Sequence, residues 1–226
     1  MKILARGTKS QVEELEIKLS SIDYSLVRFD DNNFPSANVD DFDIIFDFNF
    51  DEFPHQLKYY AGLNKKPVFV SAVKQQLAKA QHDYGKQIDC YLFGMNGLPS
   101  FINRSLFEVS LLNAKDKGIL NDSMEKLKWK YTLVEDRVGM VTPRVIFMII
   151  NEACYTLQEG TASMQDIDTS MKLGTNYPFG PFEWSDKVGI KYVYETLEAM
   201  YEDTKEERYK ICPLLKTKYL KGESFY

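Results

Sequence analysis

Apolar and polar positions in the first half of the chain follow two periods in turn, one typical of strands and one typical of helices. Strand-like runs lie at residues 2–5, 24–29, 42–48, 67–70 and 88–93. Helix-like stretches fall between them, at residues 10–19, 53–63 and 74–84. Strands that alternate with helices at this spacing favour βαβ units and a mainly parallel sheet. The pattern therefore predicts an α/β first half.

After about Val134 the pattern is helical, without a strong strand candidate. Thr142 and Pro143 predict a helix start, with Thr142 as the N-cap and Pro143 at the first helical position. This helix is expected over residues 144–159, and Gly160 is the residue type that most often follows a helix. The second half is therefore predicted to be all-α.

Further helices are expected downstream. Ser163-Met-Gln-Asp166 is typical of a capping box that opens a helix. Another helix, capped by Ser185 or Asp186, is expected over residues 187–202, broken early by Gly189, and a short one from Pro213. Between them, GTNYPFGPFEWSDKVG (residues 174–189) concentrates glycines, prolines and aromatic residues. Glycine permits positive φ and proline fixes φ, so the segment predicts a shaped turn anchored by its aromatic side chains: Tyr177, Phe179, Phe182 and Trp184.

Composition narrows the classes of partner. The net charge of −5 and the pI of about 5.2 argue against nucleic acid and anionic membranes, which favour a basic surface. The longest apolar run, residues 145–150, is far shorter than the roughly 20 residues of a membrane helix. The N-terminus lacks an apolar export segment, and the three cysteines are widely spaced. We therefore expect a cytoplasmic protein with unpaired thiols and without a metal site.

The turn after the first strand is the place to look for a dinucleotide-binding loop. Such loops read Gly-x-Gly-x-x-Gly, because glycine lets the backbone approach a pyrophosphate at a helix N-terminus. Here Ala5-Arg-Gly-Thr-Lys-Ser10 keeps one glycine of the three. Asp30 ends the second strand, where a carboxylate that binds ribose would lie. Two interpretations stay open: a modified nucleotide site that uses Gly7, Thr8 and Asp30, or a Rossmann-like turn without a ligand.

Several segments of the second half, read together, carry a family resemblance. They are Gly139-Met-Val-Thr-Pro-Arg144, Asn151-Glu-Ala153, Glu159-Gly160, Asp166-Ile-Asp168, Met171-Lys-Leu-Gly174 and Tyr177-Pro-Phe-Gly-Pro-Phe-Glu183. In this order and spacing they resemble the C-terminal domain of the 3-hydroxyacyl-CoA dehydrogenase family. The end of the chain, from Pro213-Leu-Leu-Lys216 to Gly222-Glu-Ser-Phe-Tyr226, is similar to the closing segments of that family.

The first half resembles the same family more thinly, over residues 39–47, 67–71, 91–99 and 105–109. The room between Asp31 and Val39 is too small for the strand and helical hairpin that family members have there. The resemblance implies a fold of α/β plus all-α type. Residues 1–135 would form a shortened, degenerate Rossmann-like NAD-binding domain, and residues 139–226 the C-terminal helical domain.

The resemblance also implies where catalytic residues would lie. In the family, NAD takes a hydride from a 3-hydroxyacyl-CoA while a histidine, oriented by a glutamate, takes the hydroxyl proton. Glu108 matches that glutamate, and Asn96 matches an asparagine of the substrate site. The position of the histidine is Phe93, which cannot accept a proton. The family's serine falls near Lys74 and a further asparagine falls at Pro143.

Two functions follow as alternatives. The altered glycine loop and the missing histidine favour a family protein of fatty-acid (acyl-CoA) metabolism with impaired or absent catalysis, which binds an acyl-CoA or a partner. NAD as cofactor is then implied by the resemblance alone. The alternative is an active NAD-dependent oxidoreductase that converts 3-hydroxyacyl-CoA to 3-ketoacyl-CoA. The two histidines, His55 and His82, are both expected at the surface.

The helical half also predicts an assembly. Residues 145–150 are apolar on every side of a helix, and such a helix must be covered on all faces. The family pairs its C-terminal domains across a two-fold axis, so the resemblance implies a homodimer. We expect Phe147, Met148 or Met200 at the contact. Cover by the α/β half of the same chain is the alternative.

Overall fold

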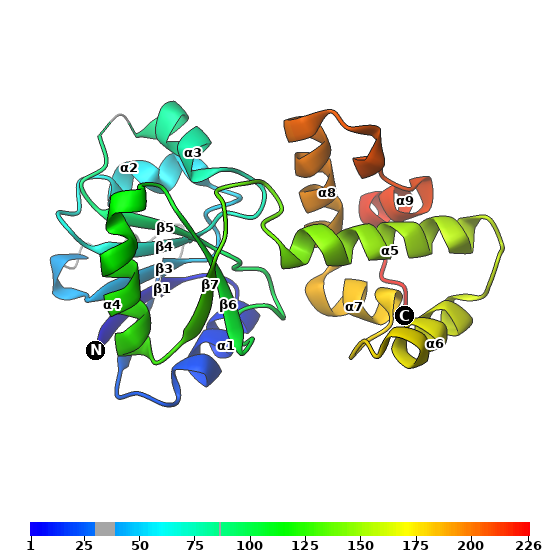
Figure 1. Ribbon diagram of the computed structural model, residues 1–226, viewed down its shortest axis with the longest axis horizontal. Coiled ribbons are helices and arrows are strands. Elements are labelled where there is room, and N and C mark those ends of the chain that lie inside the picture. The colour runs from blue at the N-terminus through cyan, green and yellow to red at the C-terminus, as the bar shows by residue number, and fades with distance from the viewer. Residues whose placement is uncertain (30–38, 86) are drawn as a thin grey trace. The chain divides into compact units, whose positions relative to one another are not determined.

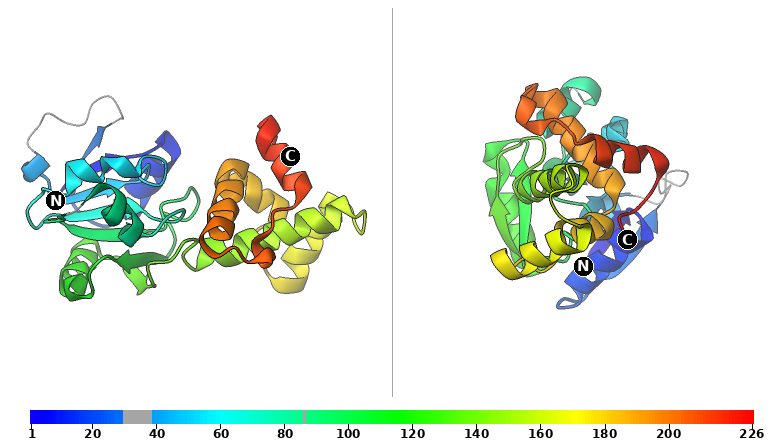
Figure 2. Two further views of the ribbon diagram at one scale, coloured as in Figure 1. Left: turned by 90° about the horizontal axis from the view of Figure 1, so that it is seen from above. Right: turned by 90° about the vertical axis from the view of Figure 1, so that its right-hand side faces the viewer.

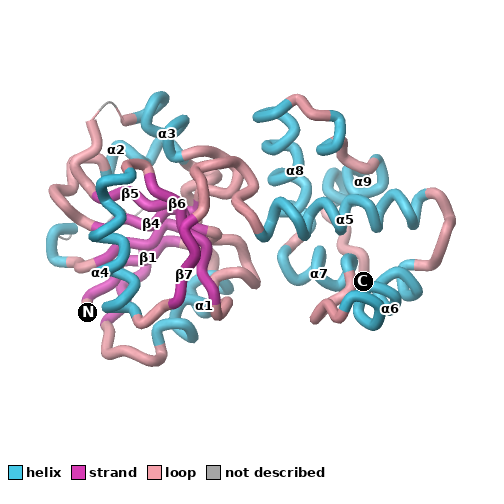
Figure 3. Tube along the Cα trace, viewed as in Figure 1, coloured by secondary structure: helices cyan, strands magenta, loops and turns pink. Residues whose placement is uncertain are grey.

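The computed structural model describes residues 1–29, 39–85 and 87–226. They form two compact units, Met1–Met140 and Val141–Tyr226 (Figure 1). Among the described residues strands occur only in the first unit, and the second consists of helices and loops (Figure 3). The predicted fold class, α/β followed by all-α, is therefore confirmed.

The first unit is built on one sheet. Its strands are β1 (Lys2–Arg6), β2 (Ser25–Phe29), β3 (Ile44–Asp47), β4 (Pro67–Ser71), β5 (Tyr91–Met95), β6 (Leu106–Leu111) and β7 (Lys130–Leu133). They lie in the order β2-β1-β3-β4-β5-β6-β7. The pair β5 and β6 is antiparallel, and the other neighbouring pairs are parallel. The predicted, mainly parallel sheet is therefore confirmed.

Helices cover both faces of this sheet. Helices α1 and α4 pack on the face that carries Ile3 and Ala5. Helices α2 and α3 pack on the opposite face, which carries Leu4, because successive strand residues point to opposite sides. The helical segments are α1 (Lys9–Leu19), α2 (Leu57–Tyr60), α3 (Leu77–Tyr84) and α4 (Lys117–Leu127), with short 3-10 turns η1 (Val39–Asp41), η2 (Pro54–Gln56) and η3 (Ala114–Asp116).

Some predicted elements differ from the observed ones. The strand expected over residues 88–93 begins at Tyr91 and continues to Met95. The helix expected over residues 53–63 is a 3-10 turn followed by the single helical turn of α2, Leu57–Tyr60. Sequence analysis did not predict β6, α4 or β7.

The second unit is a helical bundle. Helices α7, α8 and α9 contact α5, which runs through the middle of the bundle (Figure 2). Its helices are α5 (Thr142–Gln158), α6 (Met164–Thr175), α7 (Pro181–Val188), α8 (Ile190–Thr204) and α9 (Pro213–Lys221), with a 3-10 turn η4 (Glu207–Tyr209).

The two predicted helix caps of this unit had different outcomes. At the start of α6 the backbone N–H of Asp166 donates to Ser163 Oγ at 3.2 Å, so the predicted capping role of Ser163 is confirmed. The prediction of Thr142 as the N-cap of α5 is wrong. Helix α5 already includes Thr142, and Val141 occupies the cap position without a side-chain hydrogen bond.

The segment predicted as a shaped turn is mostly helix α7, so that prediction is wrong from Pro181 onward. Pro181 lies in the first helical turn, where its missing N–H costs nothing. The carboxylate of Glu183 accepts the N–H of Gly180 at 3.1 Å, and the carboxylate of Asp168 accepts the N–H groups of Phe182 and Glu183 at 2.9 and 3.1 Å. Local capping therefore makes a helix out of a segment rich in glycine and proline.

The same carboxylate explains one glycine and the end of the chain. A Cβ atom on Gly180 would lie 2.2 Å from the carboxyl carbon of Asp168, so a larger residue cannot fit there. The hydroxyl of Tyr226 donates to Asp168 at 2.9 Å, and the backbone N–H groups of Phe225 and Tyr226 donate to Asp186. Burial, together with the Asp168 carboxylate, raises the pKa of the Tyr226 hydroxyl to about 12. The C-terminus is thus fixed to α6 and α7.

The predicted dimer contacts are largely inside the protein. Phe147 and Met200 are 0% exposed, so neither can touch a second chain, and Met148 is half-buried. The cysteines are unpaired and buried. Across the described part of the chain, no helix combines the length and apolar character needed to span a membrane.

Candidate functional site

The carboxyl ends of β1 and β3 form the candidate site of the first unit. The chain leaves β1 toward β2 on one side and later returns to β3 on the other, so β1 and β3 are neighbours at a topological switch point. Ligands of open α/β sheets bind in the crevice outside such a point. Arg6 and Asp47 are paired in register there. Gly7 and Thr8 follow directly, whereas Asp30 lies outside the described residues.

Phe48 fills the space beside Gly7. Its backbone N–H donates to the carbonyl of Arg6 at 2.8 Å, and its side chain is buried. A Cβ atom on Gly7 would lie 2.9 Å from Cδ2 of Phe48, and one on Gly97 would lie 3.1 Å from Cδ1 of the same ring. The ring therefore lies between two glycines, one after β1 and one after β5. The space that side chains at Gly7 and Gly97 would occupy is therefore partly taken by the Phe48 ring.

The N-terminus of α1 is satisfied by its own residues. The N–H of Gln11 donates to Thr8 Oγ1 at 3.3 Å, and the N–H of Thr8 donates to Gln11 Oε1 at 2.9 Å. The amide nitrogen of Gln11 donates to the carbonyl of Gly97 at 2.8 Å, which ties the helix start to the loop after β5. This capping box uses two backbone N–H groups that a phosphate would otherwise bind.

A buried ionic network lies beneath this turn. Arg6 is 1% exposed and Asp47 is 0% exposed, and their charged atoms approach to 3.2 Å. The Tyr60 hydroxyl donates to Asp47 at 2.8 Å, Arg6 also donates to Gln56, and its guanidinium lies 5.0 Å above the ring of Phe53. Burial raises the pKa of Asp47, and the Arg6 charge opposes that rise. Each charge has a partner, as burial requires.

A second carboxylate lies at the ends of β3 and β4. Asp51 accepts the hydroxyl of Ser71 at 2.7 Å and the backbone N–H groups of Val73 and Lys74 at 3.0 and 2.9 Å. Burial raises the pKa of Asp51 to about 6, and these donors limit the rise. Lys74, which stands at the position matched to the family's serine, forms an ion pair with Glu52.

The structure brings two of the predicted site residues together. Asn96 follows β5 and Glu108 lies in β6, and both are buried. The N–H of Asn96 donates to the carbonyl of Glu108 at 3.2 Å, and the amide nitrogen of Asn96 lies 3.5 Å from a carboxylate oxygen of Glu108. Asn96 Oδ1 is buried without a hydrogen-bond partner among the described residues. This pair is the part of the predicted catalytic set that the fold assembles.

The position matched to the catalytic histidine lies in the core. Phe93 is 0% exposed, and its ring centroid is 4.9 Å from that of Phe69. Both histidines are exposed elsewhere in the unit: His55 packs edge-on against Phe53, and His82 lies 2.8 Å from Asp83. A protonatable side chain at residue 93 would have to be inserted among aromatic rings.

Comparisons with known proteins show what the helical unit is similar to. Residues 139–224 match the family model of the 3-hydroxyacyl-CoA dehydrogenase C-terminal domain. The helical unit is therefore similar to the C-terminal domain of 3-hydroxyacyl-CoA dehydrogenases, and the chain spans a third or less of the length of the two relatives that follow. The 3-hydroxyadipyl-CoA dehydrogenase of Escherichia coli is 46% identical over 87 residues, which cover 38% of this chain and 18% of that protein. A 3-hydroxybutyryl-CoA dehydrogenase of Bradyrhizobium diazoefficiens is 35% identical over 97 residues, which cover 43% of this chain and 33% of that protein.

Solved structures extend the likeness to the first unit, at the level of the fold alone. The (S)-3-hydroxybutyryl-CoA dehydrogenase of Ralstonia eutropha gives a TM-score of 0.74 at 19% identity, covering 98% of this chain and 94% of that chain. FadB2 of M. tuberculosis gives a TM-score of 0.75 at 14% identity, covering 99% and 97%. The first unit is therefore Rossmann-like in fold.

The NAD that 3-hydroxyacyl-CoA dehydrogenases imply can be tested against these residues. A pyrophosphate needs space over the glycine turn and free N–H groups at the start of the next helix. Phe48 takes the space beside Gly7, and Thr8 and Gln11 satisfy each other's groups. The residues present do not fit a dinucleotide bound in that manner.

Sequence analysis missed the polar residues that build this end of the sheet. Arg6, Asp47 and Asp51 were not singled out. The first two are charged residues at the ends of apolar strand runs, and charges are rarely buried unless they are paired. A charged residue at the end of an apolar strand run was the sequence signal that could have identified Arg6 and Asp47. In the described residues no group of three or more His, Cys, Asp or Glu side chains is placed to hold a metal ion.

Proposed function

We propose that this chain is a 3-hydroxyacyl-CoA dehydrogenase family protein of acyl-CoA metabolism in which NAD-dependent oxidation is impaired or absent. One observation carries the proposal: the position matched to the catalytic histidine is Phe93, buried among aromatic rings of the core. Loss of a general base costs about 10²–10⁴ in rate. A base cannot be recruited at residue 93 without repacking that core.

The glycine turn supports the same proposal independently. Phe48 occupies space beside Gly7, and the Thr8–Gln11 capping box uses N–H groups, that a dinucleotide would need. Two separate requirements of the chemistry, a base and a cofactor site, are therefore altered in one unit. The helical unit, by contrast, is 46% identical over 87 residues to a 3-hydroxyadipyl-CoA dehydrogenase. This combination favours binding of an acyl-CoA or a partner over turnover.

An active NAD-dependent oxidoreductase is the second candidate, and one observation favours it. Asn96 and Glu108 match two polar positions of the family's site and lie side by side, and among the residues that the structure describes none forms a hydrogen bond with Asn96 Oδ1. In that case another group would have to take the proton from the substrate hydroxyl.

A ligand screen and an assay separate these candidates. Thermal unfolding is followed with NAD, NADH and acetoacetyl-CoA in turn, because a ligand that binds the native state raises Tm. We expect acetoacetyl-CoA to raise Tm and both dinucleotides to leave it unchanged. NADH oxidation with acetoacetyl-CoA should be at least about 10² slower than with an active family dehydrogenase measured in parallel. Turnover at the rate of that control would overturn the proposal.

The proposal includes a homodimer formed by the helical unit. Val145, in the first turns of α5, is 53% exposed, and Val141, at the cap position one turn before it, is 52% exposed; half-buried Met148 and Ile149 lie in the next turn. This stripe, rather than Phe147 or Met200, is the surface that a second copy would cover. Light scattering should give twice the 26.2 kDa chain mass, and Val145→Asp should give the monomer. A wild-type monomer at micromolar concentration would contradict this assembly.

A further inference from the structure

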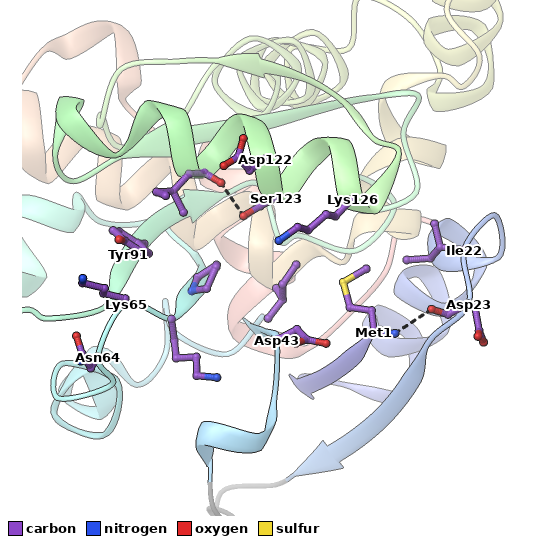
Figure 4. Close-up of a pocket in the computed structure, with 14 residues that line it drawn as sticks. Met1, Ile22, Asp23, Asp43, Asn64, Lys65, Tyr91, Asp122, Ser123 and Lys126 are labelled. Atoms are coloured by element: carbon purple, nitrogen blue, oxygen red, sulfur yellow. Dashed lines mark hydrogen bonds between the residues drawn. The ribbon is translucent and has the colours of Figure 1, made fainter.

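A groove at the opposite edge of the sheet is unrelated to the crevice described above. It opens at the amino ends of β3, β4 and β5, beside the start of β1 and along α4, and has a volume of about 760 Å³ (Figure 4). We call it the amino-edge groove. It is lined by Met1, Ile22, Asp23, Asp43, Ile44, Asn64, Lys65, Lys66, Pro67, Tyr91, Ile119, Asp122, Ser123 and Lys126.

Apolar side chains form the floor of the amino-edge groove. Met1, Ile22, Tyr91 and Ile119 are partly buried and pack against the core cluster that joins α1 and α4 to the sheet. The groove therefore exposes one side of the hydrophobic core. Its volume lies within the range of about 300–1,000 Å³ that is typical of small-molecule sites, which combine an apolar lining with a few polar groups.

The charges around this floor are not equivalent. Lys126, in the last turn of α4, directs its ammonium group into the groove, whereas the carboxylates of Asp122 and Asp23 point away from it (Figure 4). Asp43 accepts the backbone N–H of Lys2 at 2.8 Å. Within the described ranges, Lys126 has no carboxylate partner. A cation with room for a partner thus stands over an apolar floor.

We propose that the amino-edge groove binds an amphipathic organic anion, with an apolar body on the Ile22, Tyr91 and Ile119 floor and a carboxylate at Lys126. The charge selects an anion, because hydrogen bonds between a lysine ammonium group and a carboxylate are charge-assisted and stronger than those to neutral groups. The floor selects an apolar body of several carbons, each buried methylene contributing about 0.8 kcal/mol. This site does not depend on the function proposed for the family.

The test uses the full chain and a fluorescent aromatic anion. Binding of 8-anilinonaphthalene-1-sulfonate is titrated and then reversed with octanoate or with octan-1-ol, which has the same chain without the charge. We expect saturable binding and displacement by octanoate at a concentration about tenfold lower than by octan-1-ol, a ratio equivalent to about 1.4 kcal/mol. Equal potency of the two competitors would overturn the assignment of an anion.

Matched variants on α4 locate the site. Lys126→Glu should weaken the binding of the probe by about tenfold, and Lys126→Gln by less. Lys117→Glu makes the same charge change at an exposed residue of α4 outside the groove, so it should leave binding unchanged. Circular dichroism verifies that each variant is folded. Equal loss in both Glu variants, or unchanged binding in Lys126→Glu, would overturn the proposed site.

Discussion

Residues at positions matched to the family have different roles in the two units. In the helical unit, residues of the resembling segments make the contacts that stabilise it: Asp168 binds the first N–H groups of α7, Gly180 leaves room for that carboxylate, and Tyr226 closes onto it. In the first unit, positions matched to the chemistry hold side chains that pack on one another, as Phe93 does on Phe69.

This difference shows that two units of one chain can keep a fold under different sequence constraints. The helical unit cannot lose Asp168 or Gly180 without losing packing, so its sequence stays close to the family. The sheet of the first unit depends on which strand residues are apolar, and many residue types satisfy that requirement. Its fold is therefore shared with solved structures at 14–19% identity, while fold by itself does not establish activity.

The largest effect should come from the buried network of the first unit. Arg6→Ala leaves the Asp47 carboxylate buried without its cation, which should lower the free energy of unfolding by about 3–5 kcal/mol. Urea unfolding is followed by the fluorescence of Trp129, the tryptophan of the first unit, in a Trp184→Phe background. Such a loss would mark the crevice as a structural part of the unit.

A double variant is the control for this experiment. Arg6→Met combined with Asp47→Leu removes both charges and keeps apolar volume, so it should regain most of the lost stability. A loss below about 1 kcal/mol in the free energy of unfolding of Arg6→Ala would mean that water reaches the pair and that the crevice is open. The contrast between the two units would then not hold.

Gly180→Ala should have the next largest effect, this time in the helical unit. The new Cβ would collide with the Asp168 carboxylate, so we expect a loss of about 2–3 kcal/mol, read from Trp184 in a Trp129→Phe background. Gly174→Ala is the matched control: nothing lies within 4 Å of its Cβ position, and it is in helix α6. Alanine there should stabilise by about 0.5–1 kcal/mol. Equal effects of both changes would refute the role of Asp168.

How much of the fold could be predicted depended on how local the signal was. The capping role of Ser163 was predictable because the bonded N–H is three residues away. Strand β6 was missed because its buried residues include the polar Glu108 and Ser110, which interrupt the apolar pattern. Strand β7 has only four residues, Lys130–Leu133, and lies at an edge of the sheet, so its burial is too incomplete to leave a pattern.

The candidate site depends on contacts between residues far apart in the sequence, and the spacing of residues along the chain does not reveal them. Gly7 and Phe48 are 41 positions apart, and their contact exists because β1 and β3 are neighbours in the sheet. Asn96 and Glu108 were predicted from the family resemblance, and they meet because β5 and β6 pair in antiparallel register. The local sequence could show that a glycine was present, but not that a phenylalanine would fill the space beside it.

Tyr226→Phe should have a smaller effect in the helical unit. It removes one hydrogen bond to the buried Asp168 and keeps the ring, so we expect a loss of about 1 kcal/mol in the free energy of unfolding. A double-mutant cycle with Asp168→Asn measures the coupling directly. A coupling energy near zero would mean that the end of the chain adds nothing to the cap of α7.

The smallest effect concerns two carboxyl groups with opposite environments. Burial raises the pKa of Asp51 in the first unit to about 6, whereas the hydrogen bond from Lys172 lowers the pKa of Glu183 in the second. An unfolded aspartate titrates at about 3.9, so between about pH 4 and 6 folded Asp51 keeps a proton that the unfolded chain has lost. This group therefore lowers stability as pH rises through that window and leaves it level above about pH 6. Carbon-13 NMR of the side-chain carboxyls should show a midpoint near 6 that disappears in Asp51→Asn. A midpoint near 4 would place Asp51 in water and leave the crevice end of the sheet open to a ligand.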